Sequence, residues 1–317
     1  YILNIIKIDK LITSFKFLGS GFFILIIGCA LDIDSTEYSK IKWIDNSSLP
    51  VVLKRPSRLK YSWQSKIEGE PLVNRFVLTL GFKLTNVKKG SFGEWLRFLP
   101  LKPKGSKIML FDGTKKRFQM LNAGVVNIDI GTRDLQQCAD AVIRLRSEYL
   151  YSSYQYDKIH FNYTSGFNAE YSAWRAGKKI KVSGNKVNYY SAPKANDKLY
   201  SGFKKYLINV YNYAGTYSLD KELKTQNIKD IKAGDVLIIG GFPGHVVIVA
   251  NVCENSEGEK AVLLVQSYMP AQSIHVVKKM GAKGAKVWFK VKDLEKKGWS
   301  TLEFSYESTH LKTWRSN

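Results

Sequence analysis

Residues 233–252 read Ala-Gly-Asp-Val-Leu-Ile-Ile-Gly-Gly-Phe-Pro-Gly-His-Val-Val-Ile-Val-Ala-Asn-Val, and this stretch decides the fold expected for the 317-residue chain. Two short, β-branched apolar runs, Val236–Ile239 and Val246–Ala250, flank a Gly-Gly-Phe-Pro-Gly break. Runs that are apolar at successive positions are typical of strands buried on both faces, and glycine and proline between them favour a tight turn. The stretch therefore predicts two neighbouring buried strands, with His245 at the start of the second.

The composition is that of a folded protein with a strongly basic surface. Hydrophobic residues make up 44% of the chain and aromatic residues 13%, which argues against disorder. The net charge of +22 fits either an acidic partner or a lysine-rich composition bias spread over the surface. Because the basic residues are scattered and no nucleic-acid-binding motif accompanies them, we expect no nucleic-acid partner and keep an acidic cell-wall polymer as the candidate.

The first 28 residues resemble a bacterial export signal. Lys7, Lys10 and Lys16 precede the apolar stretch Phe17–Ile27, which is too short for a membrane span and suits a signal peptide. The stretch ends in Ile-Ile-Gly-Cys, which resembles a lipobox, and the resemblance implies a lipidated Cys29 as the mature N-terminus. An ordinary signal peptide, or a short anchor helix with an incidental cysteine, is the alternative.

The chain is therefore expected to have three parts. Residues 1–28 would be a signal peptide with a lipobox, residues 29–69 a polar tether, and residues 70–317 a single α+β domain. The protein would be exported and held on a membrane of the cell envelope through Cys29, at the periplasmic face or the cell surface.

The domain is expected to combine helices with an antiparallel sheet. The clearest helix is 135–150, capped by Asp134, with Cys138 in its first turns and on its inward, apolar face. Residues 151–215 form an aromatic-rich, partly helical insertion. Further helices are expected over residues 91–99, 168–174, 203–213 and 218–223, and further strands over 77–80, 107–112, 117–121, 125–130, 261–266, 273–277 and 286–291.

Cys138 and His245 have the chain order and the element types of a nucleophilic pair. A cysteine near a helix N-terminus gains thiolate character, and a histidine within reach acts as base and then as acid. Gln266, at the end of the next strand, is placed to orient the imidazole, and Gln137 or Gln136 to donate a hydrogen bond to an oxyanion.

Each of these residues also has a plainer interpretation. A cysteine on an apolar helix face is usually core, and His245 alone is more often a satisfied buried histidine. Cys138 and Cys253 could instead form a disulfide in an oxidising compartment. Tyr268 and Trp174 could line a sugar- or peptide-binding cleft or could be core. Three cysteines without a CxxC pair, and four histidines without metal-binding spacing, predict no metal site, and no motif indicates a cofactor.

The arrangement resembles the NlpC-type papain-like hydrolases, through Cys138, Gly234-Asp235, His245 and Gln266. That resemblance implies a papain-like core, in which a cysteine-bearing helix packs on an antiparallel sheet. The chain also resembles a bacterial family of secreted lipoproteins, the domain of unknown function 4846, over roughly residues 70–310. The segments that carry this second resemblance are Ser91-Phe-Gly-Glu-Trp-Leu-Arg-Phe-Leu-Pro-Leu101, Asp134-Leu-Gln-Gln-Cys-Ala-Asp-Ala-Val-Ile-Arg-Leu-Arg146, Gly240–Val249 and Gln266-Ser-Tyr-Met-Pro-Ala-Gln272.

Two functions follow from the sequence. The first is a lipid-anchored thiol hydrolase, an amidase or peptidase that cleaves an amide or peptide bond, for example in cell-wall material. The second is a non-enzymatic envelope lipoprotein that binds a peptide or glycan, with Cys138 and His245 serving only the fold.

Overall fold

A computed structural model of the chain describes residues 52–279, 287–301 and 303–315. All of them belong to one compact unit, Pro50–Asn317. The expected signal peptide, the lipobox with Cys29 and the first part of the tether lie outside the described residues. Within the described ranges, no helix is both long enough and apolar enough to cross a membrane.

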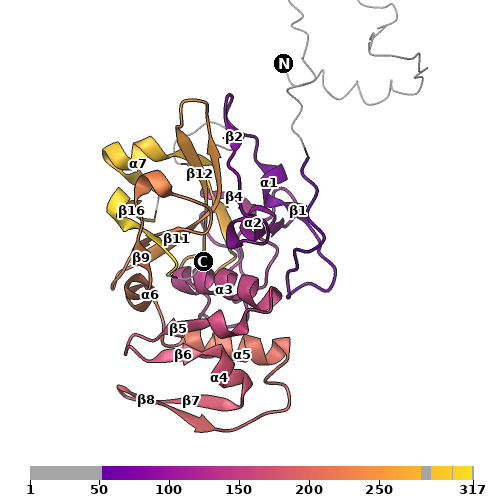
Figure 1. Ribbon diagram of the computed structural model, residues 1–317, viewed down its shortest axis with the longest axis vertical. Coiled ribbons are helices and arrows are strands. Elements are labelled where there is room, and N and C mark those ends of the chain that lie inside the picture. Colours follow the sequence, from indigo (N-terminus) through magenta and orange to yellow (C-terminus); the bar gives the residue numbers. More distant parts are fainter. Residues whose placement is uncertain (1–51, 280–286, 302, 316–317) are drawn as a thin grey trace, which may run out of the picture. The chain divides into compact units, whose positions relative to one another are not determined.

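The body is built on a nine-stranded antiparallel sheet (Figure 1). Its central strands follow the order β4-β13-β12-β11-β10-β17-β9, while β14 also pairs with β12 and β2 with β11. The strands are β2 (Lys83–Leu84), β4 (Asn122–Val125), β9 (Lys224–Thr225), β10 (Val236–Ile239), β11 (His245–Glu254), β12 (Lys260–Gln266), β13 (His275–Val277), β14 (Trp288–Lys290) and β17 (Leu311–Thr313). With the helices below, this sheet confirms the α+β class.

The two apolar runs of the stretch 233–252 form the centre of the sheet, as predicted. β10 and β11 pair antiparallel, with Ile239 opposite His245. Alternate side chains of the two strands enter different cores: Val246 packs with one hydrophobic cluster and Val247 with the other. The strands are therefore apolar at successive positions because both faces of the sheet are covered.

The part of the chain that the structure describes contains seven α-helices. They are α1 (Leu72–Arg75), α2 (Phe92–Arg97), α3 (Cys138–Ser152), α4 (Tyr171–Arg175), α5 (Tyr200–Tyr211), α6 (Thr216–Glu222) and α7 (Val291–Lys297). Helices α2 and α3 pack with one core, and α7 with the other, together with Trp299 and Tyr306. Short elements complete the body: β1 (Glu70–Pro71), β3 (Pro100–Leu101), η4 (Ile228–Asp230), β15 (Trp299–Ser300), β16 (Ser305–Tyr306) and η5 (Ser308–His310).

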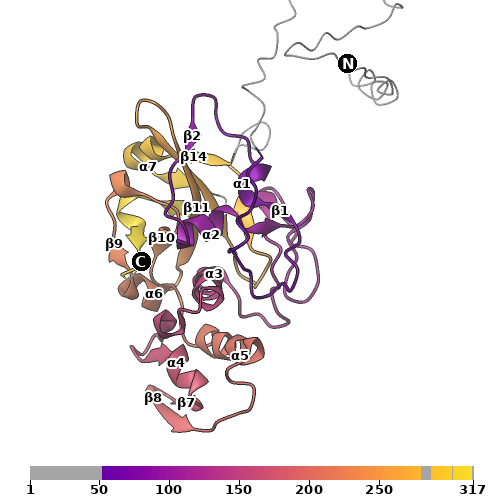
Figure 2. The same ribbon diagram turned by 45° about the vertical axis from the view of Figure 1, so that its right-hand side comes forward.

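The aromatic-rich insertion packs against α3, on the side of that helix away from the sheet (Figures 1 and 2). Stacked rings fill it, such as Tyr151 on Phe203 with their centroids 4.3 Å apart. Arg144 of α3 is buried at its border and donates hydrogen bonds to Glu148 (2.7 Å) and to Asp129 (2.9 Å). Besides α4 and α5, the insertion contains η3 (Tyr156–Lys158), β5 (His160–Asn162), β6 (Asn168–Glu170), β7 (Lys178–Ser183) and β8 (Lys186–Ser191).

Several expected strands before α3 are wrong. Residues 77–80 are not a strand, and the side chains of Val77 and Leu80 are exposed, so this run supplies no buried face. Residues 107–112 form isolated bridges, residues 117–121 form no strand, and the expected strand 125–130 is instead β4, which ends at Val125. Hydrogen bonds between loops hold this region together. Loops have no regular alternation of buried and exposed side chains, so hydrophobic periodicity in the sequence does not identify them.

The later part of the expected tether belongs to the folded body. Tyr61 is buried, donates a hydrogen bond from its hydroxyl to the Trp95 carbonyl (2.9 Å), and packs its ring 4.9 Å from that of Trp95. The backbone N–H of Leu53 donates to the Asn74 side chain (3.0 Å). Residues 53–69 therefore pack on α1 and α2 rather than forming a free linker.

Candidate functional site

Helix α3 starts three residues later than the sequence predicts, and Cys138 is its first residue. The carboxylate of Asp134 does not cap the helix at residue 135: it accepts hydrogen bonds from the backbone N–H of Ala271 (2.6 Å) and from the Gln137 side chain (3.0 Å). Gln137 is the N-cap instead, and its backbone N–H donates to Asp140 Oδ2 (3.1 Å). This later start places Cys138 at the position where a helix presents unpaired N–H groups.

The Cys138 thiol is held neutral by its surroundings. Burial raises its pKa to about 11, the Asp140 carboxylate adds to this, and the N–H groups of Ala139 and Val246 act in the opposite direction. The involvement of Val246 shows that the sulfur lies beside the start of β11. At neutral pH the cysteine is therefore a thiol in the conformation described, with 6% of the residue exposed.

His245 is fully buried at the start of β11. Its Nε2 is hydrogen-bonded to Gln266 Oε1 (3.0 Å), while its Nδ1 is buried with no hydrogen-bond partner among the residues described. The ring stacks on Phe304, with centroids 4.8 Å apart, and meets Tyr268 edge to face at 5.1 Å. Burial lowers the pKa of His245 below its usual value, and Gln266 partly offsets this.

Cys138 and His245 lie in one buried cluster without a direct hydrogen bond between them in the described structure. Burial raises the pKa values of Tyr268 and Tyr306, and charge on Cys138 raises both further. The rings of the same two tyrosines pack against the His245 ring. Cys138 packs with one core, whereas His245, by strand alternation, shares the face of Val247 in the other. The two side chains therefore lie toward opposite faces of the sheet, and Tyr268 and Tyr306 are the neighbours they share.

Gln266 connects His245 to three residues that the sequence analysis missed. Its side-chain nitrogen lies 3.4 Å from His275 Nε2 and also donates to the carboxylate of Glu303. Glu303 is in turn paired with Lys116. His275 could have been found from the pairing of β12 with β13, where it lies opposite Gln266. Glu303 and Lys116 come from distant loops, and no sequence pattern indicates them.

The other predicted site residues are distributed differently. Tyr268 lies in the cluster, against His245. The side-chain amide of Gln137 is bound to Asp134 rather than presented beside Cys138. Trp174 belongs to α4 in the insertion, where it is buried, packs against Tyr206 and carries Lys179 Nζ 4.1 Å from its ring. The structure thus does not bring Trp174 to the cysteine.

The second buried cysteine and the glycine loop have separate roles. Cys253 donates a weak hydrogen bond to the Ala261 carbonyl, and both it and Cys138 are free thiols, so the disulfide alternative is wrong for this structure. Gly240 and Gly244 belong to the Gly-Gly-Phe-Pro-Gly break, for which the sequence predicts only a tight turn. They also let α6 approach closely, because a Cβ atom would collide with Asp220 and with Thr216 respectively.

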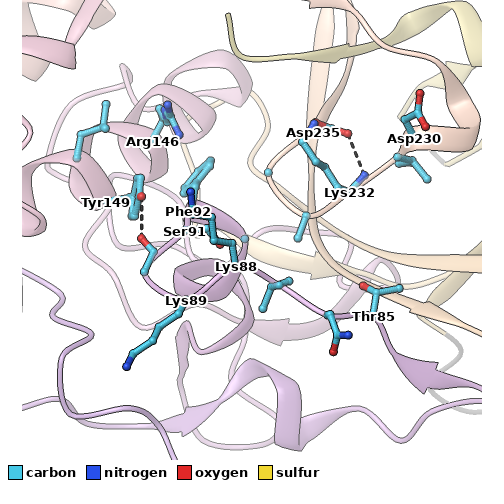
Figure 3. Close-up of a pocket in the computed structure, with 18 of the residues that line it drawn as sticks. Thr85, Lys88, Lys89, Ser91, Phe92, Arg146, Tyr149, Asp230, Lys232 and Asp235 are labelled. Carbon is cyan, nitrogen blue, oxygen red and sulfur yellow. Dashed lines mark hydrogen bonds and ion pairs between the residues drawn. The ribbon is translucent and has the colours of Figure 1, made fainter. Parts of the chain in front are cut away.

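A cavity of about 770 Å³ opens elsewhere on the body (Figure 3). It is bounded by the loop before α2, the C-terminal half of α3 and the loop before β10, and none of Cys138, His245 and Gln266 lines it. Its wall mixes aromatic and basic side chains with a few acids: Figure 3 shows Phe92, Tyr149, Lys88, Lys89 and Lys232 around the space. The described residues contain no cluster of three or more metal-ligating side chains.

The fold and the cluster define a class: an α+β protein whose central antiparallel sheet holds a buried cysteine, histidine and glutamine where α3, β11 and β12 meet. The chain belongs to the family described as Domain of unknown function (4846), which matches residues 72–313, and the resemblance to this family drawn from the sequence is confirmed. The lipoprotein assignment and the NlpC-type resemblance stay predictions. No curated protein and no solved structure is significantly similar to it.

Proposed function

We propose that the protein is a thiol hydrolase that cleaves an amide or peptide bond, with Cys138 as nucleophile and His245 as base and acid. One observation carries the proposal: His245 bonds Gln266 through Nε2 and keeps a buried, unpartnered Nδ1, in the same cluster as a cysteine at a helix N-terminus. This is the division of roles that a nucleophile, a base and an orienting group require. The resemblance to NlpC-type papain-like hydrolases supports it.

The proposed reaction has two halves. His245 Nδ1 takes the thiol proton as Cys138 Sγ forms a bond to the substrate carbonyl carbon, and the imidazolium returns this proton to the amine as the C–N bond breaks. Water then attacks the thioester and gives a proton to His245. The S–C bond breaks, a carboxylic acid leaves, and His245 returns the proton to the Cys138 sulfur.

The first turn of α3 is the better source of hydrogen bonds for the oxyanion. The backbone N–H groups of Cys138 and Ala139 have no acceptor within the helix, because they belong to its first turn. The predicted donor, the Gln137 side chain, is engaged by Asp134 and would first have to leave that carboxylate. We therefore assign the oxyanion to the backbone and keep Gln137 as a secondary donor.

The reaction requires the site to open. Cys138 is nearly buried, His245 is fully buried, and Phe304 lies flat on the imidazole. In this closed state the pKa of the thiol, about 11, protects it from reaction at neutral pH. Displacement of the segment that carries Phe304 would admit both substrate and water, and would bring the thiol and the imidazole into a more polar surrounding.

The proposal predicts a difference in reactivity between two buried cysteines of one chain. Burial raises the pKa of Cys253 to about 12 and its thiol donates to the Ala261 carbonyl, so it serves as an internal reference. At neutral pH, iodoacetamide should alkylate Cys138 faster than Cys253, and His245→Ala should slow the labelling of Cys138 roughly tenfold or more. Peptide mass spectrometry of the native protein measures both rates.

His160→Ala is the matched control, because His160 lies on β5 in the insertion, where its ring pairs with Glu222. This variant should label like the wild type. Equally slow labelling of both cysteines in the native protein, or labelling of Cys138 that His245→Ala leaves unchanged, would contradict the hydrolase proposal.

A second candidate function is favoured by the cavity of Figure 3. A space of about 770 Å³, with aromatic and lysine side chains in its wall, suits an acidic peptide or glycan and does not involve Cys138. On this proposal the protein binds its ligand without chemistry, and Cys138 and His245 only support the fold. Slow labelling of Cys138 that is independent of His245 is the outcome expected from it.

We also propose that the protein acts in the cell envelope, exported and anchored through a lipidated Cys29. The support is the lipobox resemblance, together with the net charge of +22, which suits an acidic cell-wall polymer as the partner. Substrate, anchor and partner would then lie on the same side of the membrane.

A further inference from the structure

We propose that Glu303, held in place by Lys116, is a positioning residue that determines, through the amide of Gln266, which nitrogen of His245 carries the proton. Its catalytic consequence rests on the proposed function, but the position of the proton can be measured without any activity. The inference follows from a series of hydrogen bonds, in which the donor and acceptor of one bond determine which atom donates in the next.

The series of hydrogen bonds begins at His275. Its Nδ1 lies 3.0 Å from the carbonyl oxygen of Ser273, which can only accept, so Nδ1 carries a proton. Burial lowers the pKa of His275 to about 4, so the ring is neutral and its Nε2 is an acceptor at physiological pH. That acceptor faces the side-chain nitrogen of Gln266 at 3.4 Å.

Glu303 acts on the same amide from another direction. An ionised carboxylate only accepts hydrogen bonds, and the carboxylate of Glu303 contacts the side-chain nitrogen of Gln266. The Gln266 nitrogen therefore has two acceptors, Glu303 and His275, one for each of its protons. A rotated amide would present its oxygen to a carboxylate, which costs electrostatic energy in a buried site.

The orientation of Gln266 then sets the tautomer of His245. With its nitrogen committed, Gln266 offers Oε1 to His245 Nε2 at 3.0 Å, and that nitrogen must donate. The neutral imidazole then has its lone pair on Nδ1, the nitrogen without a partner. Only this tautomer can take a proton from the Cys138 thiol at Nδ1.

Lys116 completes the arrangement. It forms a largely buried ion pair with Glu303, and its Nζ lies 5.3 Å from the centre of the Tyr268 ring. The lysine thus holds the Glu303 carboxylate in place beside Gln266. Glu303 also precedes Phe304, whose ring covers the imidazole of His245. The same segment therefore covers His245 and, through Glu303, orients Gln266 beside it.

The two partners act on His245 with opposite signs. Burial is the main cause of its lowered pKa, the negative charge of Glu303 raises that pKa, and the positive charge of Lys116 lowers it. Among the described residues, Tyr268 after β12, Tyr306 from β16 and His275 from β13 also lie around the ring, and Cys138 from α3 lies beyond Tyr306.

The test is nuclear magnetic resonance of the full chain, labelled with ¹⁵N-histidine, whose nitrogen shifts report the tautomer directly. His245→Gln assigns the His245 signals by their loss. The wild type should show a proton on Nε2 alone. Glu303→Gln keeps the size of the side chain but removes its charge, so it should admit the Nδ1-protonated tautomer and lower the pKa of His245. Lys116→Met should raise that pKa.

Glu307→Gln is the matched control, because Glu307 is exposed and is not among the groups that shift the pKa of His245. It should leave the His245 signals unchanged. A tautomer that stays entirely on Nε2 in Glu303→Gln would overturn the inference, and so would an Nδ1-protonated wild type. An inert Cys138 beside a Glu303-dependent tautomer would contradict the hydrolase and leave this inference standing.

Discussion

At the scale of single residues, burial determines the chemistry of this site more than the choice of side chains does. The thiol of Cys138 and the imidazoles of His245 and His275 all have pKa values shifted toward their neutral forms, and burial is the largest cause in each case. In the closed state the thiol and both imidazoles are therefore neutral, and the thiol is unreactive. A catalytic ion pair would form only when the polarity of the site changes.

The pKa of His275 predicts a loss of stability in mild acid. The unfolded chain binds a proton near pH 6.5, whereas the folded protein binds it only near pH 4, so the free energy of unfolding falls as the pH drops below 6.5. From this residue alone, urea unfolding should show a decrease of about 2 kcal/mol between pH 7 and pH 5. His275→Gln should be less stable at pH 7 but should lose this part of the pH dependence.

The partly exposed His310 supplies the comparison for that measurement, because its ring nitrogen bonds only a backbone N–H. His310→Gln should keep the full acid-dependent decrease. If His275→Gln also kept it, another group would be responsible, and the neutral His275 on which the Gln266 orientation depends would lose its support.

At the scale of elements, the start of α3 and the loop before β11 place the two reactive groups. The helix begins at Cys138 because Asp134 is used by Ala271, in the loop after β12. The loop 240–244 leads directly into His245 and packs on α6, where the Thr216 hydroxyl donates a hydrogen bond to the Gly241 carbonyl (3.1 Å). Both positions are therefore set by contacts between distant parts of the chain.

Gly244→Ala should destabilise the protein and disturb His245. A Cβ at this position would lie 2.3 Å from the Thr216 hydroxyl and 2.6 Å from two backbone oxygens, which cannot move without shifting the loop. Overpacking of this kind costs about 1–3 kcal/mol in the free energy of unfolding, measured by urea denaturation. Gly215→Ala is the comparison, because nothing lies within 4 Å of its Cβ, and it should be close to neutral. Equal stability of the two variants would show that the loop gives way.

At the scale of the whole molecule, one sheet with two covered faces carries the site at the end of its central strands. The insertion adds a separate aromatic layer, joined to α3 through the Tyr200 hydroxyl, which donates a hydrogen bond to the buried Glu148 (2.7 Å) and accepts one from the buried Arg144 (3.2 Å). Separating Tyr200 from α3 would take a hydrogen-bond partner from both of these buried charged groups, so this junction is costly to open. The insertion is therefore an integral part of the body, although it supplies no side chain to the Cys138 cluster that we have identified.

The proposed anchor can be tested on the intact cell. Cys29→Ser should move the protein from the membrane fraction to the soluble fraction, because removal of the acyl chains removes the apolar surface that holds it in the bilayer. Cys253→Ser, which changes another cysteine of the same chain, should leave the protein in the membrane fraction. Retention of Cys29→Ser in membranes would contradict the lipobox prediction.

The sequence by itself determined the central strands, the helix that bears Cys138 and the family. Unbroken β-branched runs could be identified because a strand buried on both faces needs apolar residues at every position, and β10 and β11 lie where those runs are. The sequence also predicted the contact between His245 and Gln266, because neighbouring antiparallel strands bring the start of one strand beside the end of the next.

Only the tertiary structure decided where α3 starts, what lies beside His245 and whether the site is open. Asp134 could cap a helix or bind a distant backbone, and the local sequence does not distinguish the two. Glu303, Lys116 and Phe304 reach the imidazole from loops that carry no periodic signal. The reason is physical: strand and helix patterns record which faces are buried, whereas the electrostatics of a site depend on which distant charges and rings are packed against it.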